Sequence, residues 1–210
     1  YFVFESSNVQ RIVLVTDDAR ASRVLQLASS ITADGKGSTQ LAVLTPDRLD
    51  SRELEETALV IWQSDLPDTL AANSLDLYVA GGGRILFFPP VGLSSGIGDL
   101  SRHYHGVRWK GWNQPGPNPV FIANWRSDQD LLAATNSGTG LPVGQLEIRE
   151  HGLLQSETAL TPLATLDGGH HLLTRLPTSA GAVYFCTVGT DASQSSLAEN
   201  GVVLFVVVQR

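Results

Sequence analysis

A serine in a glycine-rich turn is the first candidate for chemistry in this sequence. The segment 92–96, "GLSSG", fits the pattern G-x-S-x-G, in which a sharp turn after a strand presents a serine nucleophile, here Ser94. A serine hydrolase also needs an acid and a histidine further along the chain. Asp167 followed by His170 or His171 supplies them in the right order. A plain Gly/Ser-rich loop is the alternative interpretation.

The second candidate nucleophile is the single cysteine, Cys186. A cysteine nucleophile reacts as the thiolate, and a nearby histidine must lower its pKa. Cys186 lies within "VYFCTV", which predicts a buried strand, where a cysteine acts as a small apolar side chain. We therefore expect a packing role, with a reactive thiol as the alternative. One cysteine also excludes an internal disulfide.

Acidic and aromatic residues are candidates for ligand binding. Asp17 and Asp18 end the run "RIVLVTDD", and carboxylates there either contact a ligand or cap the following helix. Trp109, Trp112 and Trp125 fall in a region rich in Asn, Pro and Gly. Aromatic side chains in such a region line a groove or cover the core.

No metal site or cofactor is expected. His170 and His171 are adjacent, and neighbouring strand residues point to opposite faces. His103 and His105 would share a strand face, and with Asp99 they are the alternative metal site, but the sequence assures no third ligand.

The elements that must position these residues alternate between strands and helices, which predicts a parallel sheet with crossovers. Nearly continuous apolar strands indicate a sheet covered on both faces. Glycines 81–83 predict the end of a helix. The expected strands lie within 11–18, 41–44, 58–63 and 84–90, and the expected helices within 19–31 and 67–80.

The second half of the chain has a different pattern. Residues of about 99–145 predict an irregular, Trp-rich insertion. Strands and tight turns follow, with a hairpin signal at 167–169. We expect these strands to extend the sheet in an antiparallel manner. The run 202–208 favours a strand, with a short helix as the alternative.

Composition narrows the class of protein. The chain of 210 residues is 42% hydrophobic and 17% charged, as expected for a protein with a core. A net charge of -7 argues against a nucleic-acid partner. The sequence begins "YFVFESSN" and contains no Met, so we expect a segment of a longer protein. The longest apolar run, "GVVLFVVVQ", is shorter than the roughly 20 residues that span a bilayer, so we expect a soluble segment without direct membrane insertion.

Several runs together resemble a known family: "RIVLVTDD", "ALVIWQSDLPD", "VAGGGRILFFPP" and "GAVYFCTVGTDASQSSLAENGVVLFVVVQ". They are similar to the class I glutamine amidotransferase-like domains of bacterial membrane proteins with an N-terminal double-transmembrane region, which are BatA-like and more distantly ThuA-like. The resemblance implies a flavodoxin-like three-layer α/β sandwich. Residues 9–210 would form one domain, and residues 1–8 would end an upstream segment or form an edge strand.

The resemblance also bears on activity. An active glutaminase of this class uses a Cys nucleophile after a central strand, then His and Glu. The turn directly after "RILFFPP" contains no Cys, and the single cysteine, Cys186, comes after the histidine pair, which is the wrong order for this triad. These departures indicate a domain without the triad. The resemblance implies that it is a binding or assembly module of a membrane-anchored bacterial protein, on the extracytoplasmic side. Its partners would be other domains of the parent or a membrane complex. The alternative is a glutamine amidotransferase, or an amidase or esterase, using Cys186 or Ser94.

Overall fold

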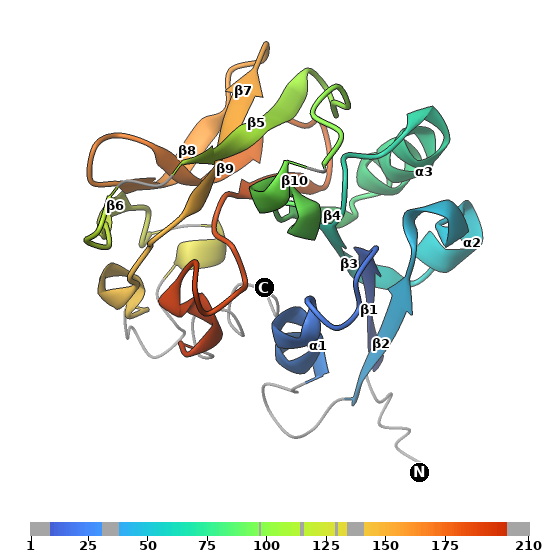
Figure 1. Ribbon diagram of the computed structural model, residues 1–210. Helices are drawn as coiled ribbons and strands as arrows, with labels where there is room; N and C mark the ends of the chain where they lie inside the picture. The colour runs from blue at the N-terminus through green and yellow to red at the C-terminus, as the bar shows by residue number, and fades with distance from the viewer. Residues whose placement is uncertain are drawn as a thin grey trace.

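The computed structural model describes residues 9–30, 38–96, 98–113, 116–128, 130–133 and 141–200. Within these ranges the largest feature is an eight-stranded sheet of order β2-β1-β3-β4-β10-β9-β8-β6 (Figure 1). Its first five strands are parallel neighbours. They are β2 (Ser38–Leu44), β1 (Val9–Thr16), β3 (Thr57–Gln63), β4 (Arg84–Phe87) and β10 (Ala182–Cys186).

Antiparallel strands complete the sheet beyond β10, as predicted for the C-terminal third. These are β9 (His171–Leu176), β8 (Thr161–Leu166) and β6 (Ile122–Trp125). The hairpin predicted at 167–169 connects β8 to β9. A separate two-stranded sheet pairs β5 (Val107–Asn113) with β7 (His151–Ser156) (Figure 1).

Helices cover both faces of the parallel strands. α1 (Arg23–Ser30) lies on one face, and α2 (Ser51–Leu54) and α3 (Thr69–Ala80) lie on the other (Figure 1). Alternate residues of β1 follow this division, because side chains of a strand alternate between its two faces. Leu14 packs in one apolar cluster with Leu25 of α1, whereas Val15 packs in a second with Leu75 of α3. The chain is therefore an α/β sandwich with two cores.

The three consecutive glycines end α3, as the sequence predicts. The Gly81 N–H donates to the Leu77 carbonyl at 3.0 Å, and Gly82 has a φ of 97°, a conformation that favours glycine. A Cβ atom on Gly83 would overlap the ring of Tyr78. The glycines thus stop the helix and allow the chain to enter β4 at once.

The stretch of about 99–145 is more regular than predicted, because it contains β5 and β6. Both strands pair with segments that follow much later, so their local sequence carries little signal. Residues 1–8 and 202–208 lie outside the described residues, and so the predictions for them stay predictions. Among the helices that are described, none has the length and apolar character to cross a bilayer.

Candidate functional site

The carboxyl ends of β1, β3, β4 and β10 meet at one edge of the sheet. The connection from β1 runs over the face that carries α1, and the connection from β3 runs over the opposite face through α3 (Figure 1). In open α/β sheets, ligands bind beyond the strand ends where the crossovers diverge in this way. This edge is therefore the place to search for a site.

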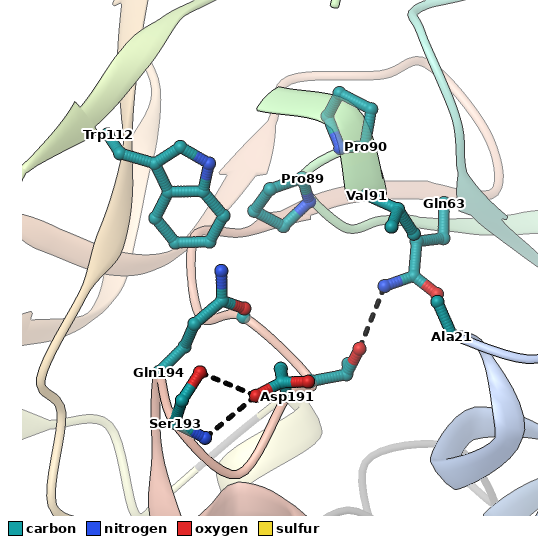
Figure 2. A pocket seen from close by; sticks show the side chains of 11 residues that line it. Ala21, Gln63, Pro89, Pro90, Val91, Trp112, Asp191, Ser193 and Gln194 are labelled. Atoms are coloured by element: carbon teal, nitrogen blue, oxygen red, sulfur yellow. Dashed lines mark hydrogen bonds between the residues drawn. The ribbon is translucent and has the colours of Figure 1, made fainter. Parts of the chain in front are cut away.

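A cavity of about 250 Å³ opens at this edge (Figure 2). We call it the carboxyl-edge cavity. Its volume lies just below the range of about 300–1,000 Å³ for pockets that hold drug-sized ligands, so it suits a smaller molecule. Its walls come from segments that are far apart in the sequence, namely Ala21, Gln63, Pro89, Pro90, Val91, Trp112, Gly189, Thr190, Asp191, Ser193 and Gln194.

Gln63 is one of two deeply buried polar residues that line this cavity, since Gln63 and Thr190 each have 4% of their surface exposed. The Gln63 amide nitrogen donates to the Thr190 hydroxyl at 2.8 Å (Figure 2). Its amide oxygen is buried and has no hydrogen-bond partner among the described residues. Such an oxygen costs about 1–3 kcal/mol when nothing donates to it. Gln63 thus offers an acceptor to whatever occupies the cavity.

Trp112 forms another wall, and its indole nitrogen is also buried without a partner among the described residues. Gly189 lets this wall approach the loop after β10. A Cβ atom on Gly189 would lie 2.9 Å from Cη2 of Trp112 and would overlap the amide of Gln194. A glycine is therefore required here for the indole and the Gln194 side chain to share one wall.

Asp191 contributes the charge of the cavity. Its Oδ1 accepts hydrogen bonds from the Ser193 hydroxyl at 2.6 Å and from the Ser193 N–H at 2.8 Å (Figure 2). These two bonds lower the pKa of the Asp191 carboxyl below its usual value. Asp191 therefore carries a full negative charge at neutral pH.

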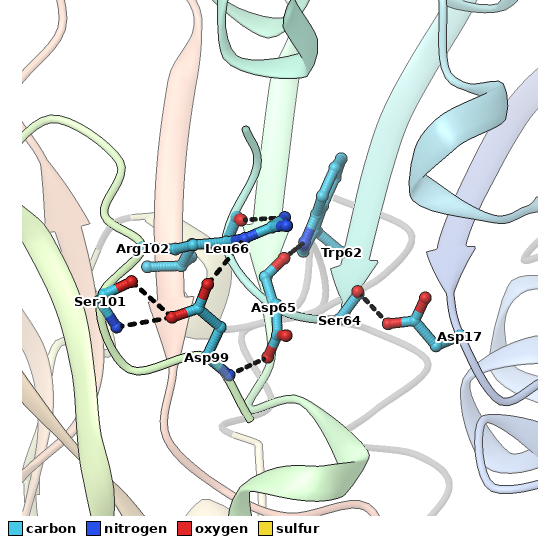
Figure 3. A network of polar contacts seen from close by, with 8 residues as sticks. All are labelled: Asp17, Trp62, Ser64, Asp65, Leu66, Asp99, Ser101 and Arg102. Atoms are coloured by element: carbon cyan, nitrogen blue, oxygen red, sulfur yellow. Dashed lines mark hydrogen bonds and ion pairs between the residues drawn. The ribbon is translucent and has the colours of Figure 1, made fainter. Parts of the chain in front are cut away.

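The predicted ligand contacts Asp17 and Asp18 lie beside the cavity. Asp17 accepts a hydrogen bond from Ser64, the residue after Gln63 (Figure 3). Asp18 accepts from the backbone N–H groups of Arg20 at 2.8 Å and Ala21 at 3.1 Å, and so shapes the turn before α1. Neither carboxylate lines the cavity itself.

Further along the same edge, Asp65 joins the β3 loop to the loop after β4. Its side chain accepts from the Asp99 N–H at 3.0 Å, and its carbonyl accepts from the indole of Trp62 at 2.8 Å (Figure 3). The Asp99 carboxylate in turn accepts hydrogen bonds from the Ser101 N–H and from the Arg102 guanidinium. These bonds fix the loops that surround the cavity.

The nucleophile candidates occupy different surroundings. Cys186 is buried at the end of β10, and burial raises the pKa of its thiol to about 12. His170 and His171 are both exposed, and among the described residues no histidine hydrogen bonds with this thiol. The backbone of Ser94 lies in the short 3-10 helix Val91–Ser95, and its side chain lies outside the described residues.

The three tryptophans do not form one surface. Trp109 is buried in the core, and Trp112, on the same strand, lines the cavity. Trp125 is exposed on β6 beside Gly144, at the far end of the sheet. Only Trp112 of the predicted group therefore reaches the cavity.

No three His, Cys, Asp or Glu side chains gather into a metal-binding group within the described residues. His105, one of the histidines considered for a metal, instead contacts the Asp76 carboxylate at 2.8 Å. The same carboxylate accepts the Tyr104 hydroxyl at 2.7 Å. This cluster joins α3 to the start of β5.

Sequence reasoning did not single out Gln63, Thr190 or His151. The sequence does carry one signal for Gln63, because a polar residue at the carboxyl end of an apolar strand indicates a candidate ligand contact. His151 has only 1% of its surface exposed, and its Nδ1 has no partner among the described residues. Burial, with a smaller contribution from His170, lowers its pKa to about 4, so its imidazole is neutral at pH 7.

Comparison with known proteins identifies the fold. No protein-family model and no curated protein matches the sequence. The chain is similar to the structure of a ThuA-like protein from Bacteroides uniformis, with 14% identity, a TM-score of 0.65, and coverage of 100% of this chain and 93% of that one. A ThuA-like protein from Parabacteroides merdae gives 12% identity and a TM-score of 0.55, with 95% and 88% covered.

A β-galactosidase from Bacillus circulans is also similar, with 15% identity and a TM-score of 0.61 over 97% of this chain. The chain spans only 31% of the length of that enzyme. At these identities the likeness shows the fold alone. The ThuA-like part of the predicted resemblance is confirmed at the level of the fold, and the BatA-like part stays a prediction.

Proposed function

We propose that this chain is a non-catalytic binding domain with a glutamine amidotransferase-like α/β fold, and that it binds a small polar molecule in the carboxyl-edge cavity. One observation carries the proposal. Gln63 lines this cavity, and its amide oxygen is buried with no partner among the described residues, which is rare in a native protein. A ligand that donates a hydrogen bond satisfies it.

Two observations support a domain without glutaminase chemistry. An amidotransferase needs a thiolate with a histidine at about 2.6–3.2 Å. The Cys186 thiol is buried with a raised pKa, which favours its neutral form. The predicted histidines, His170 and His171, are exposed around the β8–β9 turn.

The finer assignments of the fold and its context belong to the same proposal. The order β2-β1-β3-β4-β10 of the parallel strands supports a flavodoxin-like unit, to which the antiparallel strands are added. We propose that the domain works within a larger membrane-anchored bacterial protein, with neighbouring domains as its partners, as the family resemblance implies.

A fragment screen tests the binding function. Polar fragments are screened by ligand-observed NMR against the unmodified protein, Ala21→Trp and Ala123→Trp. Ala21 is exposed at the cavity, so an indole there closes the opening, whereas Ala123 is exposed on β6 and is the matched control. We expect fragments that bind the unmodified protein and Ala123→Trp but not Ala21→Trp.

Two results contradict the proposal. The first is a screen in which no fragment is lost specifically from Ala21→Trp. The second is a glutaminase or amidase activity of the unmodified protein that Cys186→Ala abolishes, because such an activity requires a reactive thiol at the end of β10.

A further inference from the structure

We infer that the carboxyl-edge cavity selects a ligand that carries a positively charged amino group next to a hydroxyl or carbonyl oxygen. The inference rests on the proposed function and adds the charge and the hydrogen-bonding pattern of the ligand. It follows from the charges at the cavity and from the polar atoms that its walls leave unpartnered.

The charge around the cavity is negative. Among the described residues, Asp191 is the one lining residue with an ionised side chain, and no described Lys or Arg lines the cavity. Asp17 and Asp18 add two carboxylates at the adjoining strand end. An anionic ligand would therefore meet like charges with no cation to compensate them, which is unfavourable at short range.

Two described arginines close to the lining segments in sequence do not change this balance. Arg149 approaches the Asp191 loop, but its guanidinium donates to the Ala192 carbonyl at 3.0 Å and to the Glu147 carboxylate at 2.9 Å. Arg20 is exposed in the turn before α1 and does not line the cavity. The carboxylate of Asp191, a lining residue, therefore has no cationic partner among the described residues.

The unpartnered acceptors match an ammonium group. Oδ1 of Asp191 accepts both bonds from Ser193, and its Oδ2 accepts none among the described residues. The amide oxygen of Gln63 is the second acceptor, and the bond from Gln63 to Thr190 ties it to the same loop (Figure 2). An ammonium group has three donors and no acceptor, so it is complementary to unpartnered oxygens of this kind.

The indole of Trp112 requires the complementary group. Its buried N–H is a donor without a partner among the described residues, which favours a ligand that also presents an acceptor. The indole ring stands beside the Gln194 amide at the cavity wall, and its face attracts a cation (Figure 2). An amino alcohol or an amino sugar has this combination of groups within the size of the cavity.

Glucosamine, glucose and N-acetylglucosamine test the charge, because they share one ring and differ in the ammonium group. Binding is measured by titration calorimetry at a pH at which the amine of glucosamine is protonated. We expect glucosamine to bind at least about tenfold more tightly than the other two sugars, as one charge-assisted hydrogen bond provides. Asp191→Asn should remove this preference, whereas Asp167→Asn, on the exposed β8–β9 turn, should retain it.

The outcomes separate this inference from the proposed function. If the sugars bind equally well and Ala21→Trp abolishes binding, the cavity is a binding site and the inferred charge is wrong. If no sugar binds, the inference is tested by the fragments that bind the unmodified protein but not Ala21→Trp. If most of these fragments are amines, they support the inference. If most of them are neutral or anionic, they overturn it. If no fragment is excluded by Ala21→Trp, both proposals are wrong.

Discussion

The two edges of the parallel sheet each hold a cavity, and the cavities differ in whether their polar groups have hydrogen-bond partners. At the amino edge, a cavity of about 470 Å³ is bordered by Asp130, whose carboxylate accepts from Arg175 at 3.1 Å and from the Tyr184 hydroxyl at 2.9 Å. At the carboxyl edge, Gln63 and Trp112 keep buried polar atoms without partners among the described residues. The mutually satisfied groups of the amino-edge cavity stabilise the fold, whereas the unsatisfied groups at the carboxyl edge support the proposed ligand site.

The largest effect that we expect comes from His151, on the carboxyl side of the molecule, where its backbone bridges to Val188. Its pKa is about 4 in the folded protein and 6.5 when unfolded, so the unfolded chain binds the proton more tightly. The neutral imidazole therefore stabilises the fold fully above pH 6.5. About 3 kcal/mol of this stability is lost as the pH falls from 6.5 through 4.

Urea unfolding at several pH values checks this prediction. His151→Phe keeps the ring and removes the titration, so its stability should fall less steeply with acidification. His171→Gln, at an exposed position, is the control and should follow the unmodified protein. Identical pH profiles for His151→Phe and the unmodified protein would contradict the prediction.

At the amino edge, Asp130→Asn should cost about 2 kcal/mol of unfolding free energy. Asn tolerates the φ of 62° at this position, so the change removes mainly the charge that faces Arg175. The cost lies below that of a fully buried ion pair because the Arg175 side chain is 38% exposed. Chemical denaturation measures the loss, and ligand binding at the other edge should be unchanged.

The matched control for this change is Glu157→Gln, which breaks the surface pair with Arg108. The Glu157 side chain is 68% exposed, so the expected cost is below about 1 kcal/mol. If both variants lose the same stability, the amino-edge cluster is no more than a surface ion pair.

Tyr184→Phe should have a smaller effect at the same edge. It removes the hydroxyl that donates to Asp130 but leaves the bonds from Arg175 in place. We expect a loss of about 1 kcal/mol in urea unfolding. In the double variant with Asp130→Asn, the two costs should sum to more than the measured loss, because both remove the same interaction.

The smallest change in stability is expected for Gln63→Met, at the carboxyl edge. The variant loses the bond to Thr190, worth about 1 kcal/mol, and also removes a buried oxygen whose desolvation costs about 1–3 kcal/mol. Stability should stay within about 1 kcal/mol of the unmodified protein, while fragment binding in the cavity is lost. A loss above about 2 kcal/mol would show that Gln63 has a structural role, like Asp130.

The sequence predicts the parallel half of the fold because its signals are local. The apolar runs of β1 and β3, the helical spacing of α1 and the glycines after α3 each fall within one element. The strand β5 escapes such reasoning because its register is set by long-range pairing, as with Val107 opposite Ser156.

The candidate site, like the fold, is predictable from the sequence only where its signals are local. The edge that carries it follows from the parallel order of the strands, and Asp17 and Asp18 do lie beside the cavity. The contact between Gln63 and Thr190 joins residues 127 positions apart, and no local pattern indicates it. Burial decides the state of Cys186 and His151, and burial is a property of the assembled core.

The assembly of the cavity from distant segments links ligand concentration to the amount of folded protein. Ala21 and Gln194 line one cavity only when the turn before α1, β3, β5 and the loop after β10 have all come together. A ligand held there has no counterpart site in the unfolded chain. At a concentration one hundred times its Kd, it adds about 2.7 kcal/mol to the free energy of unfolding. Under the proposed function, ligand binding therefore lowers the unfolded fraction of the domain.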